Sequence, residues 1–260
     1  MELIDTHCHL SFEQLAPDVA AVLKRSKQAG VTSWITVGTD IEDSKKAVEL
    51  ADRFDRLYAA VGIHPHQAGQ VGPQTIEQLR ELAKEVNVVA VGETGLDFHY
   101  NFSEQADQRR AFAAHLQLAG ELNLPVIVHS RDAFDDTIEV LERFGPDGGK
   151  VVFHCFSGSP EQAEQLLERG YYISFTGVAT FKNAETIRQS AKIVPVERVM
   201  LETDCPYMSP EPMRKQKVNE PALMVHTARF LAELKGMPLA DFAAAVTAAS
   251  KAFFNLPDVA

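Results

Sequence analysis

The sequence predicts an α/β protein of the (β/α)8 barrel class, with one extra helix at its C-terminal end. Eight short apolar runs alternate with segments of helical periodicity along the chain. The runs are almost continuously apolar, which is typical of strands buried on both faces of a parallel sheet. The length of 260 residues suits one such barrel, which usually takes roughly 250 residues. A doubly wound open sheet would more often carry a glycine-rich phosphate turn after its first strand, and none is present.

The strands and helices are predicted from local patterns. Val19, Val22 and Leu23 have the spacing of a helix, and Gly30 indicates where that helix ends. The later helices are predicted from the same two signals. Trp34 is expected in the core. The predicted strands are 3–9, 33–37, 57–61, 88–91, 125–128, 151–153, 171–175 and 199–201. The predicted helices are 18–29, 42–54, 74–85, 104–122, 132–144, 161–169, 184–193, one from about 221, and the extra helix 239–254. Segments 94–103 and 205–218 are predicted as longer loops.

Composition limits the classes of protein. A hydrophobic content of 45% and a charged content of 23% indicate one globular domain over 1–260. No apolar run approaches roughly 18 residues, so we expect no membrane span. Glu2 and Asp5 interrupt the apolar run that a signal peptide would need at the N-terminus, so none is expected. Three cysteines without a CxxC pattern indicate reduced thiols in the cytoplasm. A net charge of −11 gives no global attraction for nucleic acid, which would have to be held locally.

The first strand carries the first candidate for chemistry. Alternate side chains of a strand share a face, so Asp5, His7 and His9 point the same way. Two imidazoles side by side at a strand end can chelate one metal ion. Taken alone, they could equally be two polar histidines leaving the core.

Histidines and carboxylates recur where the predicted strands end. The carboxyl ends of the strands of such a barrel converge on one mouth, where active sites lie. His115 and His226, by contrast, are expected on helix surfaces. Imidazoles and carboxylates that converge suit divalent ions, so the joint pattern predicts a metal site. The strand-end residues are His7, His9, His64, His66, Glu93, His129, His154, Glu202 and Asp204.

The number of ligands favours two ions over one, because a catalytic zinc ion usually takes three protein ligands. Glu93 lies centrally in strand order and could bridge them, and the ions would activate a water molecule as nucleophile. Asp204 could bind one ion and orient the water or accept its proton. Glu202 could handle protons as well, or could be the buried partner of an Arg or Lys.

Several stretches resemble the TatD family of metal-dependent hydrolases, within the amidohydrolase superfamily, and the resemblance covers nearly the whole chain. The matching stretches are 4–10 (IDTHCHL), 62–66 (GIHPH), 92–97 (GETGLD), 125–131 (PVIVHSR), 154–158 (HCFSG), 177–181 and 201–207 (LETDCPY).

The resemblance implies a distorted (β/α)8 barrel and a deoxyribonuclease that depends on Mg²⁺, Mn²⁺ or Zn²⁺. It implies that Glu93 is shared between two ions and that Asp204 is the ligand and base at the last strand. The implied ligands of one ion are His7, His9 and Glu93, and those of the other are Glu93, His129 and His154. Some relatives remove D-amino acids from tRNA.

The chain departs from the family in two places. The family often carries His-Arg-Gly-Lys where residues 213–218 stand here, and Asn where Ser250 stands. Neither place holds a predicted ligand, so the departures concern substrate contacts and local packing.

Substrate contacts are less specific. The resemblance favours His64 as a hydrogen-bond donor to phosphate, whereas His66 could do the same or merely form a His-Pro-His turn. Arg131 could bind phosphate bidentately or pair with Asp132 or Asp135. The basic cluster Arg214, Lys215 and Lys217 could contact a nucleic acid backbone or be a solvated loop.

These observations predict a cytoplasmic, monomeric hydrolase with two divalent ions that cleaves phosphodiester bonds, as a 3′-to-5′ exonuclease on single-stranded DNA. RNA and aminoacyl-tRNA are further possible partners. The alternative enzyme is an amide or ester hydrolase, such as a D-aminoacyl-tRNA deacylase. A barrel that binds metal without catalysis is disfavoured, because both Glu93 and Asp204 are present.

Overall fold

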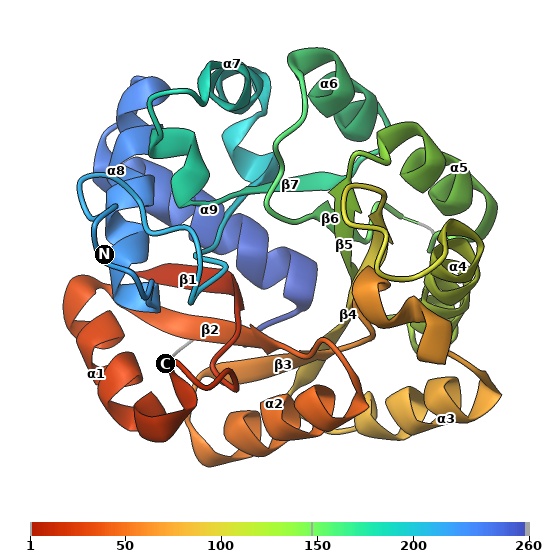
Figure 1. Cartoon of the computed structure of the whole chain (residues 1–260). Coiled ribbons are helices and arrows are strands. Elements are labelled where there is room, and N and C mark those ends of the chain that lie inside the picture. Colours follow the sequence, from red (N-terminus) through yellow and green to blue (C-terminus); the bar gives the residue numbers. More distant parts are fainter. Residues whose placement is uncertain (1, 147, 258–260) are drawn as a thin grey trace. The chain divides into compact units, whose positions relative to one another are not determined.

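The computed structural model describes residues 2–146 and 148–257, and its strands follow one another in sequence order (Figure 1). Each strand is followed by a helix, as predicted. The strands are β1 (Leu3–Cys8), β2 (Val31–Val37), β3 (Leu57–Val61), β4 (Val88–Asp97), β5 (Val126–Arg131), β6 (Val151–Phe153), β7 (Tyr172–Phe175) and β8 (Val199–Leu201). The helices are α1 (Val19–Ala29), α2 (Ile41–Arg53), α3 (Pro73–Leu82), α4 (Gln105–Leu122), α5 (Phe134–Phe144), α6 (Pro160–Glu168), α7 (Glu185–Ile193), α8 (Met224–Leu234) and α9 (Leu239–Phe254). None of the described helices is long and apolar enough to cross a bilayer.

Strand β4 is the main departure from the predicted boundaries. It was expected to end at Val91 but continues to Asp97, pairing with β5 as far as Arg131. Gly92 and Gly95 have φ of +143° and +144°, and a Cβ on Gly95 would lie 2.0 Å from the carbonyl oxygen of His129. Only glycine permits this approach between the two backbones. The glycines that signal a loop in the sequence are therefore what lets the strand continue.

The chain contains two compact units, and the second in sequence order, unit 2, runs from Val37 to His154. It contains β3 to β6, which pair in parallel as β3–β4, β4–β5 and β5–β6. Helix α2 packs against β3, and α4 packs against β4. The core of this unit consists of buried aliphatic strand residues such as Val91 and Val128.

Unit 1 runs from the N-terminus to Thr36 and resumes at Cys155. Its strands pair in parallel as β1–β2 and β7–β8. β1 also lies beside β8, where the Thr6 hydroxyl donates to the Leu201 carbonyl at 3.0 Å. Helix α9 packs against β1 and β8, as expected of an extra helix (Figure 1). Trp34 is fully buried, as predicted, and its Nε1 donates to Ser26 Oγ. That the whole chain forms one domain stays a prediction.

His115 was predicted on a helix surface, and this prediction is wrong. It lies on the inner face of α4 and is fully buried. Its Nε2 accepts from the Ile63 backbone N–H at 3.0 Å, so its Nδ1 carries the proton and donates to the Ala111 carbonyl. The core tolerates this side chain because backbone groups satisfy both ring nitrogens.

Acid is expected to destabilise the metal-free protein partly through His115. Burial lowers the pKa of His115 to about 4, so the unfolded chain binds the extra proton first as the pH falls below about 6.5. The stabilisation is complete above that pH and declines towards pH 4, by about 2 to 3 kcal/mol between roughly pH 7 and pH 4.5. Urea unfolding of wild type and His115→Gln at both pH values measures it. The variant should lose less stability than wild type on acidification. Burial also lowers the pKa of half-buried His226, so His226→Gln should show a smaller effect in the same direction. Equal losses in wild type and His115→Gln, or an effect of His226→Gln as large as that of His115→Gln, would contradict the assignment.

Candidate metal centre

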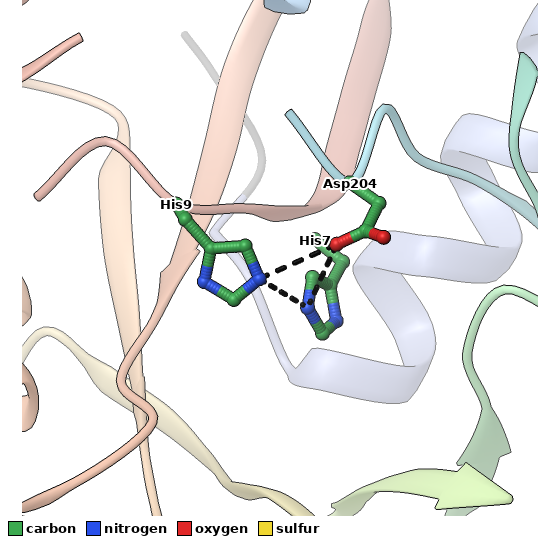
Figure 2. Close-up of side chains that lie close together, drawn as sticks. All are labelled: His7, His9 and Asp204. Atoms are coloured by element: carbon green, nitrogen blue, oxygen red, sulfur yellow. Dashed lines mark hydrogen bonds and ion pairs between the residues drawn. The ribbon is translucent and has the colours of Figure 1, made fainter. Parts of the chain in front are cut away.

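In unit 1, the end of β1 and the segment after β8 bring His7, His9 and Asp204 together (Figure 2). The Nε2 atoms of the two histidines lie 3.2 Å apart. Asp204 Oδ1 lies 3.3 Å from His9 Nε2 and 3.8 Å from His7 Nε2. All three side chains are buried. The sequence singled out these residues, and the structure places one donor atom of each within 4.8 Å of the others.

Backbone hydrogen bonds hold this cluster. Asp204 N donates to the His7 carbonyl at 2.9 Å, and His9 N donates to the Cys205 carbonyl at 2.9 Å. Asp5, on the same strand, is not a member of the cluster. Its buried carboxylate accepts from both the backbone N–H and the hydroxyl of Thr203, at 2.9 and 2.6 Å. Asp5 therefore fixes the residue next to Asp204.

The donor set of this cluster fits a divalent ion. Two imidazole nitrogens bound ~2.1 Å from one tetrahedral ion lie ~3.4 Å apart, close to the 3.2 Å between His7 and His9. Two imidazoles and a carboxylate suit zinc or manganese. The three donor atoms converge from buried side chains, as the ligands of one ion would.

In unit 2, the carboxyl-terminal halves of β4 and β5 and the residue after β6 bring a second set of donors together. Glu93 Oε1 lies 2.7 Å from His129 Nδ1 and 2.7 Å from His154 Nε2. The two histidine nitrogens are 3.2 Å apart. His64 Nε2 lies 3.5 Å from the same carboxylate oxygen. Three predicted ligands thus meet here. His64, which was predicted to donate a hydrogen bond to phosphate, lies beside them.

Charge and burial compete in this second cluster. Burial alone would raise the pKa of Glu93, but electrostatic interactions with His154 and His64 and a hydrogen bond with His129 hold it well below its ordinary value. Burial alone would lower the pKa of His129, but hydrogen bonds with Asp97 and Glu93 raise it. Burial dominates for His64 and lowers its pKa to about 4. The site therefore presents an ionised Glu93 beside a neutral His64 at neutral pH.

Asp97 is a functional candidate within segment 94–103, which the sequence predicted as a loop. It is buried at the end of β4. Its Oδ2 lies 3.2 Å from His129 Nε2 and 2.9 Å from His66 Nε2. A carboxylate that accepts from one nitrogen of a histidine leaves the other nitrogen unprotonated and oriented towards a metal. Its place at the end of the GETGLD stretch was the available signal.

The structure shows the surroundings of His66 and Arg131, whose roles the sequence left open. His66 N donates to His64 Nδ1 at 3.1 Å, which is the His-Pro-His turn. The Arg131 guanidinium lies 4.7 Å from the centre of the Tyr100 ring. Asp132 instead pairs with His99 at 2.8 Å, and within the described residues Arg131 forms no ion pair.

Unit 1 holds the remaining candidates. Glu202 is buried, and its Oε1 accepts from the Cys155 backbone N–H at 2.6 Å. The basic cluster Arg214, Lys215 and Lys217 is exposed, as a solvated loop would be. Arg214 lies 3.7 Å from the centre of the Phe181 ring.

Comparisons with known proteins bear on the whole chain. Residues 4–255 match the family described as TatD related DNase. The uncharacterized metal-dependent hydrolase YcfH of Escherichia coli K12 is 41% identical over 95% of this chain and 93% of its own. A 3′-5′ ssDNA/RNA exonuclease TatD of Erwinia tasmaniensis is 35% identical over 98% of this chain and 100% of its own. The crystal structure of the Escherichia coli TatD homologue YJJV has a TM-score of 0.92 at 34% identity, covering 98% of both chains. These likenesses confirm the predicted (β/α)8 barrel class.

Proposed function

The chain belongs to the family of TatD-related DNases, which makes it a metal-dependent hydrolase, and from that premise we propose that it is a 3′-to-5′ exonuclease on single-stranded DNA that uses two divalent ions. The observation that carries the proposal is the presence of a donor cluster in each unit, His7–His9–Asp204 in unit 1 and Glu93–His129–His154 in unit 2. Each supplies three donors, which is what one catalytic ion requires. Glu93 remains the predicted bridge.

Divalent ions, when bound, lower the pKa of a coordinated water and offset the charge of a phosphodiester. The chain supplies the groups that move protons. Asp204 would accept a proton at a carboxylate oxygen, since its buried carboxylate faces two imidazoles. Glu202 is proposed to handle protons as well, while its Oε1 holds the backbone after His154.

Phosphate recognition is assigned to His64 and Arg131. Because His64 Nδ1 accepts from the His66 backbone, a neutral His64 carries its proton on Nε2. This N–H lies on the side of Glu93, where a phosphate oxygen could accept it. Arg131 has no ion pair within the described part of the chain, so its guanidinium is available to a second phosphate.

The proposal is tested with metal-stripped protein and a 5′-labelled single-stranded oligonucleotide. Re-addition of Mg²⁺, Mn²⁺ or Zn²⁺ should restore a ladder that shortens from the 3′ end, and EDTA should abolish it. RNA of the same sequence and a D-aminoacyl-tRNA are the comparison substrates. Hydrolysis of the aminoacyl ester without cleavage of DNA would establish the alternative function, and no turnover of any substrate would favour a metal-binding barrel without catalysis.

Location and assembly belong to the same proposal. Cys8, Cys155 and Cys205 form no disulfide in the described part of the chain, which supports a reducing compartment such as the cytoplasm. A monomer is proposed, and light scattering of the purified protein tests it.

A further inference from the structure

Two aromatic side chains of unit 2 are exposed just beyond the end of β4. Tyr100 is 48% exposed and Phe102 is 69% exposed. Their rings are stacked, with centroids 5.3 Å apart and planes 14° from parallel. Exposed aromatic area of this kind contributes nothing to the core, and adjoining exposed apolar groups mark interaction sites.

The loop that carries these rings is held by its own hydrogen bonds. Asp97 Oδ1 accepts from the backbone N–H groups of His99 and Tyr100, at 3.0 and 2.9 Å. Asn101 has φ of 51°, and its side-chain amide donates to the Phe98 carbonyl at 2.7 Å. Ser103 Oγ donates to the His66 carbonyl at 2.8 Å. The two rings are therefore presented on a fixed loop, which lowers the entropy lost when a ligand stacks on them.

The rings adjoin the second donor cluster through one side chain. The ring of His66 packs edge-on against Phe102, with centroids 4.7 Å apart, and lies 6.5 Å from the ring of His129. His66 also shares the Asp97 carboxylate with His129. Arg131, on the other side of Asp97 in the β4–β5 register, covers Tyr100. A flat apolar face, a guanidinium and a candidate metal ligand thus lie next to one another.

We propose that Tyr100 and Phe102 form a stacking platform for a nucleobase of a single-stranded substrate, adjacent to the phosphate that is cleaved. The inference rests on the proposed function and names how that site holds its substrate. Every base has a π-face, so stacking on aromatic side chains is independent of sequence. Stacking also supplies affinity that an acidic chain of net charge −11 cannot obtain from a general positive field.

Phe102→Ala is the principal test. Stacking of one base is worth roughly a 5- to 150-fold change in affinity, so KM for a single-stranded oligonucleotide should rise within that range while kcat changes by less than about twofold. Phe102→Trp keeps the face and should retain the wild-type KM. Val86→Ser removes an apolar side chain that is 88% exposed before the start of β4 and should change neither constant.

An abasic substrate separates stacking from a general effect of the variant. If Phe102 stacks on a base, an oligonucleotide that lacks that base should have the raised KM with wild-type protein. Phe102→Ala should then change KM for this substrate by less than about twofold, because the interacting pair is already broken. A full effect of Phe102→Ala on every abasic position would overturn the platform.

Binding is measured separately from cleavage. Fluorescence anisotropy of a labelled oligonucleotide, read with wild type and Phe102→Ala in Ca²⁺ or Mg²⁺, gives Kd whether or not cleavage occurs. Weaker binding by Phe102→Ala, with no cleavage by wild type, would support the platform and refute the exonuclease. Cleavage by wild type with the same KM and Kd in Phe102→Ala would refute the platform alone. Absence of both binding and cleavage would overturn both.

Discussion

Replacing Asp204 with Asn is expected to reduce kcat for cleavage of single-stranded DNA by at least about a thousandfold. The carboxylate is both a proposed ligand and the proposed proton acceptor, and a neutral amide oxygen is poor at either task. Its Oδ1 lies 3.3 Å from His9 Nε2 within a buried cluster, so no neighbouring water can easily replace it. Measurement of kcat in saturating Mg²⁺ gives the result.

The loss must be shown to be local. Asn has the volume of Asp, and the backbone N–H of residue 204 still donates to the His7 carbonyl, so thermal unfolding should shift by only a few degrees. Asp55→Asn makes the same change at an exposed position and should keep wild-type kcat. Retention of more than about a tenth of the activity by Asp204→Asn would contradict its role as base.

An element of the fold was predicted correctly where the local sequence pattern reflected which of its residues are buried. Apolar runs such as β3 and β6 were found at their true limits, because the runs were short and bounded by polar residues. The predicted strand was shorter than β4 because glycines such as Gly92 and Gly95 usually indicate a turn in a sequence. In the structure they instead allow β4 to pack closely against β5. His115 was misplaced for a related reason. Its hydrogen-bond partners are the Ile63 N–H and the Ala111 carbonyl. Both are backbone groups, so the residue types in the sequence do not reveal them.

The residues of the candidate site also differ in how far the sequence could predict them. His7, His9, Glu93, His129, His154 and Asp204 could be named because each stands at or just after the end of a predicted strand, where the topology of such a barrel is expected to bring ligands together. Asp5 and Asp97 could not be assigned, since each acts through a hydrogen bond to a residue distant in sequence. The exposure of Tyr100 and Phe102 also depends on the path of a loop. The sequence therefore located the candidate ligands, while the structure was needed for the residues that hydrogen-bond to them or lie beside them.

Glu93→Gln is expected to abolish detectable cleavage and to lower metal affinity by more than about a hundredfold. A residue that only hydrogen-bonds to a ligand costs roughly 10- to 100-fold in metal affinity when replaced, and a ligand should cost more. Gln keeps the volume of Glu93 but removes the charge that sits 2.7 Å from both His129 and His154. Titration calorimetry with Mn²⁺ or Zn²⁺ on the metal-stripped variant measures the affinity and the number of ions bound.

The roles of Glu93, Asp204 and Asp97 can be distinguished by replacing each carboxylate with its amide and counting the ions that each variant binds. If Glu93 bridges two ions, Glu93→Gln should lose both, whereas Asp204→Asn should lose one. Asp97→Asn should still bind two at saturation, with affinity reduced roughly 10- to 100-fold, because Asp97 contacts His129 and is not itself a proposed ligand. Loss of a single ion from Glu93→Gln would show that Glu93 serves one cluster only. Two ions bound with unchanged affinity would remove Glu93 from the ligands altogether, and the bridged centre with it.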